Sequence, residues 1–399
     1  MIQATEVPHF IVKNKFQKNN KLKYSDILTD DVLADISSRL TGQKLYTITF
    51  DDEGYNKGRL VIMHYGGIIT YISIAETEVR SRNSSFQSFT TAYSMFSRDN
   101  NPKGDICYYI IQGTVGNIET DYFIFMYRLM KTAGVKLINL VDYVSTNILP
   151  FNAAEDVILA KEKLRKAAKG NRSTYVTKGS NGAIQIFAKT YGANKYESSL
   201  LCFALVKLTS SIELFQIEEG GLTALPQATR DALALLGHVI IKTSNETSET
   251  EEFKSNNSLR SIRFIYNILE RFGAKKCLLC DCEIPQIVQG AHIWPVASIK
   301  ASIDLELKVQ LNHAINGSNG MWLCENHHKL FDSNILSVTS DGTVLYIDEL
   351  DNRHVDYLKL TTTRAKIGVE FLTDEFIFYL SKRNSEISID RYRCFEVIS

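Results

Sequence analysis

Alternating apolar and polar positions predict strands in the first part of the chain. Residues 46–50 and 59–73 alternate in this way or run as stretches rich in β-branched residues, and Gly66-Gly67 interrupts the second stretch. This pattern predicts a hairpin within an N-terminal domain of mixed α/β structure. Residues 183–189 and 200–215 form two later stretches with strand-like or buried apolar patterns. No internal repeat accompanies them.

Two segments between these strands have the period of helices. Residues 122–131 form the first, and residues 153–168 form the second. The second begins after Asn152, has Glu155 three positions on, and stops before Gly170. A side-chain oxygen at the start, a carboxylate three residues later and a terminal glycine are typical of helix boundaries.

The composition changes sharply at residue 243. Residues 243–258 are almost entirely polar and acidic, so they bury little apolar surface, and we expect a linker there. We expect Ser258 to cap the next helix, which ends near Gly273. The apolar stripe of that helix consists of Leu259, Ile262, Ile265, Ile268 and Leu269.

Length and composition exclude several classes of protein. A chain of 399 residues has room for two or three domains, and its 44% hydrophobic content excludes disordered and fibrous classes. No apolar run approaches the length of a membrane span, and residues 1–6 lack the form of a signal peptide. The seven cysteines are an odd number, and four of them are concentrated within residues 277–324, unlike a disulfide framework. We expect a cytoplasmic protein that does not enter a membrane.

Two pairs of residues near the C-terminus have the spacing of zinc ligands. Cys277 and Cys280 form one pair, and Cys324 and His327 form the other. Tetrahedral zinc takes thiolates and imidazoles, and a two-residue gap lets both side chains of a turn reach one ion. The alternative is that the cysteines are ordinary buried thiols. Cys282 lies too close to Cys280 to share its turn, and we interpret it as a spare thiol.

Three further residues are candidates for catalysis. His292 follows an apolar stretch and precedes a proline, which suggests the end of a strand, where a neutral imidazole can accept a proton near neutral pH. His328 and Asp332 are four residues apart on a predicted short helix, so their side chains share a face and could hold one divalent cation. Alternatively, His292 is a structural histidine, His328 a surface residue and Asp332 a capping partner.

Basic residues cluster within residues 161–195. The whole chain has no net charge, since it contains 45 basic and 45 acidic side chains. Clustered positive charge favours contact with the phosphates of DNA. A solvated helix face is the alternative. The cluster contains only Glu162 among Lys161, Lys163, Arg165, Lys166, Lys169, Arg172, Lys178, Lys189 and Lys195.

These motifs together carry a resemblance to a known family. Their order is CxxC at Cys277, AHIWP at residues 291–295, NGMWLCENHHKLFD at residues 319–332, and a hairpin-like stretch at residues 334–346. This order resembles the HNH endonucleases, whose core is a ββα-metal fold, and the likeness covers residues 273–347. The combination is specific to that family.

The resemblance implies a role for each motif residue. His292 would be the general base, Asn319 would brace the loop that carries it, and His328 would bind the catalytic Mg²⁺ or another divalent cation. The Cys277 site would hold a structural Zn²⁺. Many members of the family have an acidic ligand directly before the first histidine, where this chain has Ala291, so Asp332 stays a candidate ligand. Weaker competitors for the bracing and ligand roles are His313 and Asn316, which we expect in a loop.

The expected fold is a multidomain α+β protein: a mixed α/β N-terminal recognition region followed by a zinc-stabilised ββα-metal nuclease domain. We expect a mixed domain over residues 1–150, a basic DNA-recognition region over 151–242, the linker over 243–258, the nuclease domain over 259–350 and a C-terminal extension over 351–399. A carboxylate and lysine cluster, Asp304, Glu306 and Lys308, is better explained as surface residues.

The function that these expectations favour is a sequence-specific type II restriction endonuclease that cuts double-stranded DNA as a homodimer. Two alternatives stay open. One is a modification-dependent or signal-activated HNH nuclease of phage defence. The other is a DNA-binding protein whose nuclease core has decayed, with Ala291 as the sign of decay.

Overall fold

The structure is a computed structural model. The chain forms two compact units, an N-terminal unit of Met1–Val176, Ile186–Gln216 and Gly221–Lys242, and a C-terminal unit of Thr177–Gln185, Ile217–Gly220 and Thr243–Ser399. The structure describes residues 29–44, 46–50, 60–65, 68–76, 93, 105–111, 120–138, 149–167, 174–189, 193–220, 225–256 and 261–395.

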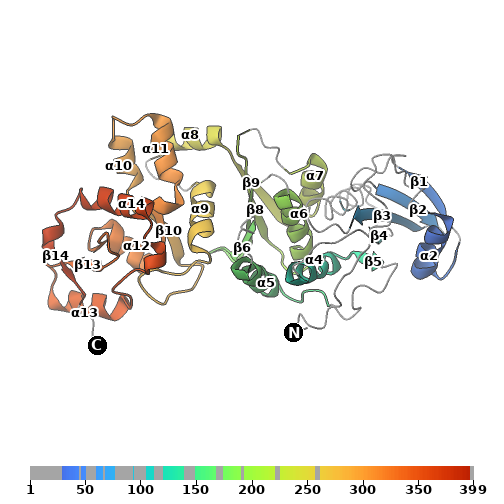
Figure 1. Ribbon diagram of the computed structural model, residues 1–399, viewed down its shortest axis with the longest axis horizontal. Coiled ribbons are helices and arrows are strands. Elements are labelled where there is room, and N and C mark those ends of the chain that lie inside the picture. Colours follow the sequence, from blue (N-terminus) through green and yellow to red (C-terminus); the bar gives the residue numbers. More distant parts are fainter. Residues whose placement is uncertain are drawn as a thin grey trace. The chain divides into compact units, whose positions relative to one another are not determined.

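The first sheet of the N-terminal unit contains the predicted hairpin. Its strand order is β1-β2-β3-β4-β5, and β2 and β3 pair antiparallel with Ile62 opposite Tyr71. The β3–β4 and β4–β5 pairs are parallel, so the sheet combines parallel and antiparallel strands, which the pattern had not predicted (Figure 1). The helix predicted over residues 122–131 is also confirmed. The elements are α2 (Asp30–Thr41), β1 (Thr47–Phe50), β2 (Leu60–Tyr65), β3 (Ile68–Glu76), β4 (Asp105–Ile111), α4 (Thr120–Thr132) and β5 (Lys136–Ile138).

A second sheet, of order β6-β7-β8-β9, follows in the chain. The helix predicted over 153–168 and the strand predicted over 183–189 are confirmed as α5 and β7. The stretch 200–215 is a strand only at its end, because Leu200 to Leu205 complete helix α6 and are all fully buried. A continuous buried run shows no period, so the pattern could not separate helix from strand. The elements are α5 (Ala154–Ala167), β6 (Thr174–Lys178), β7 (Ile184–Lys189), α6 (Ala193–Leu205), β8 (Ile212–Ile217), α7 (Gln227–Leu235) and β9 (Val239–Ser244).

The expectation of a linker over 243–258 is wrong for its described residues. Strand β9 ends at Ser244, and α8 (Glu246–Ser255) begins directly after Asn245, whose Oδ1 accepts a hydrogen bond from the Ser248 amide at 2.8 Å. Phe253 is fully buried, and the buried Glu249 accepts hydrogen bonds from Ser244 and Ser261. One aromatic anchor, one cap and one satisfied carboxylate order a segment whose average composition suggested disorder.

The predicted amphipathic helix is present as α9 (Ile262–Phe272), and it ends at Gly273 as expected. Its cap is Ser261, whose Oγ accepts from the Arg263 amide at 3.0 Å, whereas Ser258 lies outside the described residues. The helix packs closely on the strands below it. A Cβ atom added at Gly320 would lie 2.7 Å from Ile268 Cδ1, so only glycine permits this approach.

The core of the C-terminal unit is an antiparallel strand pair followed by a helix, the ββα arrangement that the resemblance implied. Strands β10 and β11 pair with His292 opposite Gly320, and α12 begins directly after β11 (Figure 1). The hairpin-like stretch from residue 334 is confirmed as the β12–β13 pair. The elements are β10 (Val288–His292), α10 (Val296–Ala301), α11 (Leu307–Ile315), η2 (Gly317–Asn319), β11 (Gly320–Cys324), α12 (Glu325–Asp332), β12 (Leu336–Val338), β13 (Val344–Ile347), α13 (Asn352–Thr361), η3 (Val369–Phe371), α14 (Asp374–Asn384), η4 (Ile389–Arg391) and β14 (Tyr392–Cys394).

A helix that crosses a bilayer needs about 20 consecutive, largely apolar residues. No helix in the described part of the chain is long and apolar enough to do so.

Candidate active site and metal centre

The two cysteine and histidine pairs converge on one point. The ligand atoms of Cys277, Cys280, Cys324 and His327 all lie within 4.8 Å of one another. Cys280 Sγ and Cys324 Sγ are 3.9 Å apart, and Cys277 Sγ lies 3.6 Å from His327 Nδ1. Zinc–sulfur bonds of about 2.3 Å in a tetrahedron place sulfurs about 3.8 Å apart. The donor set and its spacing therefore fit a structural Zn²⁺, and Cys282 stands outside the cluster.

The surroundings of the cluster select its ligand atoms. His327 Nε2 lies 3.2 Å from Thr362 Oγ1, so that nitrogen is engaged and Nδ1 faces the thiols. Burial lowers the pKa of His327 to about 4, which keeps the imidazole neutral as a ligand must be. Burial raises the pKa of Cys280 to about 12, so this thiol loses its proton only when a cation compensates the charge.

His292 ends β10 and is held on two sides. Its ring stacks on Phe264 of α9, with ring centroids 3.7 Å apart and planes inclined by 5°. Its Nε2 lies 2.9 Å from the carbonyl oxygen of Ala314. A carbonyl accepts only, so Nε2 carries the proton and Nδ1 keeps a free lone pair. Burial, with a smaller contribution from the nearby His328, lowers the pKa of His292 to about 4.

Asn319 connects the strand pair to the loop that follows His292. Its side chain is fully buried, Oδ1 accepts from the Trp294 amide at 2.7 Å, and Nδ2 donates to the carbonyls of Trp294 and His313, both at 3.1 Å. The Asn319 carbonyl also accepts from the Ile293 amide at 2.9 Å. Two consecutive residues after His292 are thus fixed by Asn319, which is the contact that a bracing role needs.

His328 and Asp332 lie on one face of α12, as the four-residue spacing predicts. His328 Nε2 and Asp332 Oδ2 are 3.4 Å apart, and Asp332 is exposed. Two ligands of an octahedral cation with bonds of about 2.1 Å are separated by about 3 Å when adjacent. The pair therefore fits one small divalent cation, with the remaining positions open to water and phosphate.

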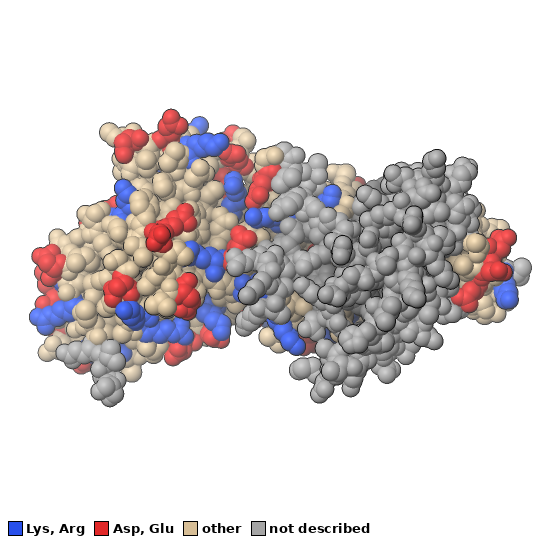
Figure 2. All heavy atoms as spheres, in the orientation of Figure 1, with Lys and Arg blue, Asp and Glu red and all other residues tan. Residues whose placement is uncertain are grey.

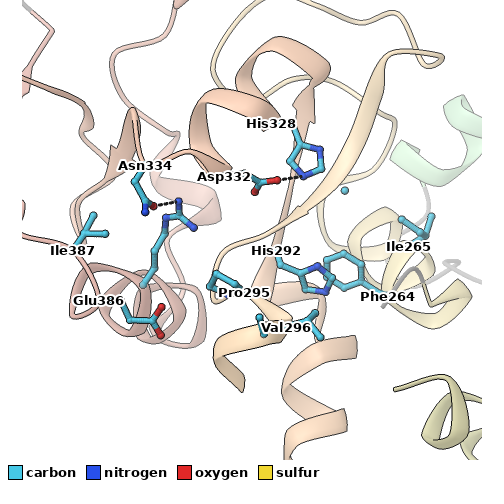
Figure 3. A pocket seen from close by; sticks show the side chains of 13 residues that line it. Phe264, Ile265, His292, Pro295, Val296, His328, Asp332, Asn334, Glu386 and Ile387 are labelled. Atoms are coloured by element: carbon cyan, nitrogen blue, oxygen red, sulfur yellow. Dashed lines mark hydrogen bonds and ion pairs between the residues drawn. The ribbon is translucent and has the colours of Figure 1, made fainter. Parts of the chain in front are cut away.

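His292, His328 and Asp332 line one pocket of about 450 Å³ in the C-terminal unit. In Figure 3, His292 faces this space from the β10 side and His328 with Asp332 faces it from the α12 side. The α9 residues Phe264 and Ile265 and the downstream residues Arg383 and Glu386 complete its wall. A proton acceptor and a candidate cation site therefore share one cavity.

Part of the cavity wall lies in a segment that is similar to a known protein family. The model of the HNH endonucleases matches residues 277–339. The chain carries an HNH endonuclease domain. Such a domain indicates an endodeoxyribonuclease, a hydrolase of DNA phosphodiester bonds that uses divalent metal ions. A search of curated proteins with the chain gave no match.

Ala291 stands directly before His292, at the position where the resemblance would place an acidic metal ligand. Ala291 lies opposite Met321 in the strand pair, is fully buried and is not part of the pocket wall. Because alanine has no side-chain ligand atom, position 291 cannot supply a second ligand for the catalytic cation. Asp332 lies in the wall beside His328, which makes it the better candidate.

The weaker candidates have structural partners. His313 lies in helix α11 and not in the expected loop, with Nδ1 2.9 Å from the Tyr379 hydroxyl. Asn316 follows that helix and donates to Glu375 at 2.7 Å. Neither residue lines the pocket. The carboxylate and lysine cluster of Asp304, Glu306 and Lys308 is exposed, as expected for surface residues.

Several residues of the two sites were not predicted from the sequence. Phe264, Thr362 and Arg383 lie outside the matched segment and belong to no short motif. Of these three residues, only Phe264 lies within the predicted amphipathic helix, although the predicted apolar stripe did not include it. Their roles depend on which chain segments meet in space.

The basic segment needs one correction. Lys161 is buried and pairs with the buried Glu197, because the helical period places it on the inner face of α5 with Val157 and Leu164. It is not a phosphate contact. Lys163 is exposed, whereas Arg165, Lys178, Lys189 and Lys195 are half-buried. The side chains of Lys166, Lys169 and Arg172 lie outside the described residues.

Charge is mixed elsewhere on the described surface. On the face in Figure 2, Lys and Arg side chains of the HNH domain lie among Asp and Glu side chains. Arg364 and Lys366, for example, pair with Asp281 and Asp341.

Proposed function

We propose that this protein is a sequence-specific type II restriction endonuclease that cuts double-stranded DNA. The observation that carries the proposal is the shared pocket, where His292 faces the same space as His328 and Asp332. The pocket also argues against a decayed nuclease, because the base, its brace and a candidate ligand pair remain together.

His292 would act as the general base. Since Nε2 donates its proton to the Ala314 carbonyl, Nδ1 is the atom that accepts a proton from the attacking water. The water oxygen then forms a bond to phosphorus, and the bond from phosphorus to the 3′ oxygen breaks. The low pKa of His292 keeps the ring unprotonated at neutral pH, and Phe264 keeps its plane fixed.

His328 and Asp332 would hold the catalytic Mg²⁺. When bound, this ion would neutralise the charge that develops on the phosphate and on the departing oxygen. The Cys277 cluster would hold Zn²⁺ and take no part in the reaction, because its ligands close a four-coordinate site.

We further propose that residues 1–242 choose the target and that two chains cut the two strands of a palindromic site. Phosphate contacts set affinity and register, whereas base contacts set choice, and the HNH domain supplies the chemistry for either strand. The basic segment, without Lys161, supports phosphate binding in this region.

The test is digestion of methylated and unmethylated plasmid DNA with the full chain and magnesium, followed by sequencing of the ends. A restriction enzyme gives discrete fragments with one sequence at every end from unmethylated DNA. Cleavage of methylated DNA alone would favour a modification-dependent nuclease. Cleavage at unrelated sites would contradict sequence specificity, and absence of cleavage would contradict the proposed function.

A matched pair of lysines tests the role of the basic segment. Lys163→Met removes an exposed charge and should weaken binding to all duplexes, reducing the salt slope by about one. Lys161→Met, made together with Glu197→Gln so that no buried charge is left unpaired, removes a buried charge from the same helix and should leave the slope unchanged. Binding titrations across salt concentrations measure both. If the salt dependence of binding had the same slope for Lys163→Met and the wild type, Lys163 would not be a phosphate contact.

A further inference from the structure

Arg383 lies at the end of α14, 44 residues beyond the segment that matches the HNH family. It is 97% buried and lines the pocket. A buried guanidinium needs acceptors for its donors, and the identity of those acceptors is informative.

The acceptors belong to both sides of the active site. Nη1 donates to the carbonyl of Ile293, the residue directly after His292, at 3.3 Å. Nη2 donates to the carbonyl of Phe331, the residue directly before Asp332, and to Asn334 Oδ1 at 2.7 Å. The guanidinium carbon lies 3.7 Å from the centre of the Phe331 ring.

We propose that Arg383 is a positioning residue that fixes the separation between the strand bearing His292 and the helix bearing His328 and Asp332. This inference rests on the proposed function of those three residues. One planar cation with donors on several edges spans two segments that share no direct covalent or strand link at this point. A Lys ammonium has one nitrogen and does not span the same acceptors.

A second residue of the same segment supports this assignment. Glu386 accepts from the Trp294 indole at 3.0 Å and from Ser298 at 2.7 Å. Arg383 and Glu386 thus hold Ile293 and Trp294, the first two residues after His292. The chain beyond the matched segment therefore completes the support of the catalytic loop, and of these two residues it is Arg383 that also contacts α12.

The experiment compares Arg383→Lys with the wild type. Because a misplacement of about 1 Å costs roughly 100-fold in rate, we expect kcat to fall by about 10- to 100-fold, while the Kd for DNA stays within about twofold. Arg391→Lys is the matched control, since Arg391 is half-exposed, lies in the same extension and pairs with Glu349 away from the pocket. It should leave kcat unchanged.

Chemical rescue separates positioning from a general loss of structure. In Arg383→Ala, millimolar guanidinium should restore part of the lost kcat, and urea at the same concentration should not. Zinc content should remain at the wild-type level in both Arg383 variants. Arg383→Lys with wild-type kcat would overturn the inference alone. So would a variant that loses zinc, DNA binding and kcat together. A wild-type chain that cuts no DNA would instead overturn the proposed function, and the inference with it.

Discussion

His327 and His328 are neighbours in α12, yet they belong to two sites that are built in different ways. His327 is buried and faces three thiols that come from two short motifs. His328 is half-buried and faces a pocket whose wall comes from α9, β10, α12 and the segment around α14. One helix register, about 100° per residue, directs the two side chains to these different surroundings.

The difference shows what each site requires. A closed zinc site needs four donors at bonding distance, and one turn and the start of α12 supply them. A catalytic pocket must also orient a base, hold a cation and admit substrate, so it uses contacts from distant segments. Loss of one zinc ligand should therefore affect folding, whereas loss of one pocket residue should affect rate.

The largest effect is expected at the zinc cluster. Cys280→Ser replaces a thiolate by a poor ligand, and because structural zinc sites contribute about 10 kcal/mol or more of binding free energy to folding, the HNH domain should lose most of its stability. Elemental analysis should show about one zinc per wild-type chain and far less in the variant.

Cys282→Ser is the control, because Cys282 lies in the same turn outside the cluster. It should keep both the zinc and the melting temperature. A Cys280→Ser protein with full zinc and unchanged melting would show that the cluster is not the zinc site.

The next effect is on rate alone. His292→Ala removes the proposed base, and a positioned base contributes about 10²- to 10⁴-fold to the rate. We expect kcat to fall by roughly 1,000-fold with DNA binding, measured with calcium in place of magnesium, nearly unchanged. His354→Ala, at an exposed histidine of α13, should be silent. Substantial cutting by His292→Ala would assign the base to another group.

A smaller loss is expected at the brace. Asn319→Ala leaves the Trp294 amide and two carbonyls without their buried partner, which costs about 1–3 kcal/mol of unfolding free energy. The loop after His292 then shifts, and kcat should fall by roughly 100-fold. Asn316→Ala removes contacts to Glu375 and to the Ser318 amide but leaves the Asn319 side chain and its partners in place, so it should change kcat little. Comparable losses in both variants would mean that Asn319 is not a specific brace.

The sequence predicted those parts of the molecule whose signal is local. The zinc pairs, the His292 strand end and the four-residue spacing of His328 and Asp332 each occupy a short stretch, and the structure places them as the spacing implied. Helices with a clear period, such as α5 and α9, were located to within a few residues at their described ends.

The remaining features depend on tertiary contacts. Lys161 was predicted to contact DNA because it lies among other basic residues in the sequence. Charge alone does not indicate which face of α5 is buried. Composition suggested a linker where Phe253 anchors α8. Arg383 donates hydrogen bonds to residues that are 52 and 90 positions away along the chain. A short sequence motif cannot include residues so far apart. The roles of such residues can be recognised only from the tertiary structure.

The smallest expected effect is on the pH dependence of cleavage. It tests whether burial lowers the pKa of His292. A base must be unprotonated, so a lowered pKa extends activity towards acid. With a pKa of about 4, about 97% of His292 is unprotonated at pH 5.5, whereas a histidine of ordinary pKa, about 6.5, would be about 9% unprotonated. At saturating magnesium, single-turnover rates should therefore change little between pH 8 and pH 5.5 and decline as pH approaches 4. A tenfold fall by pH 5.5 would show that His292 is more accessible to water than its stacking on Phe264 and its contact with Ala314 imply.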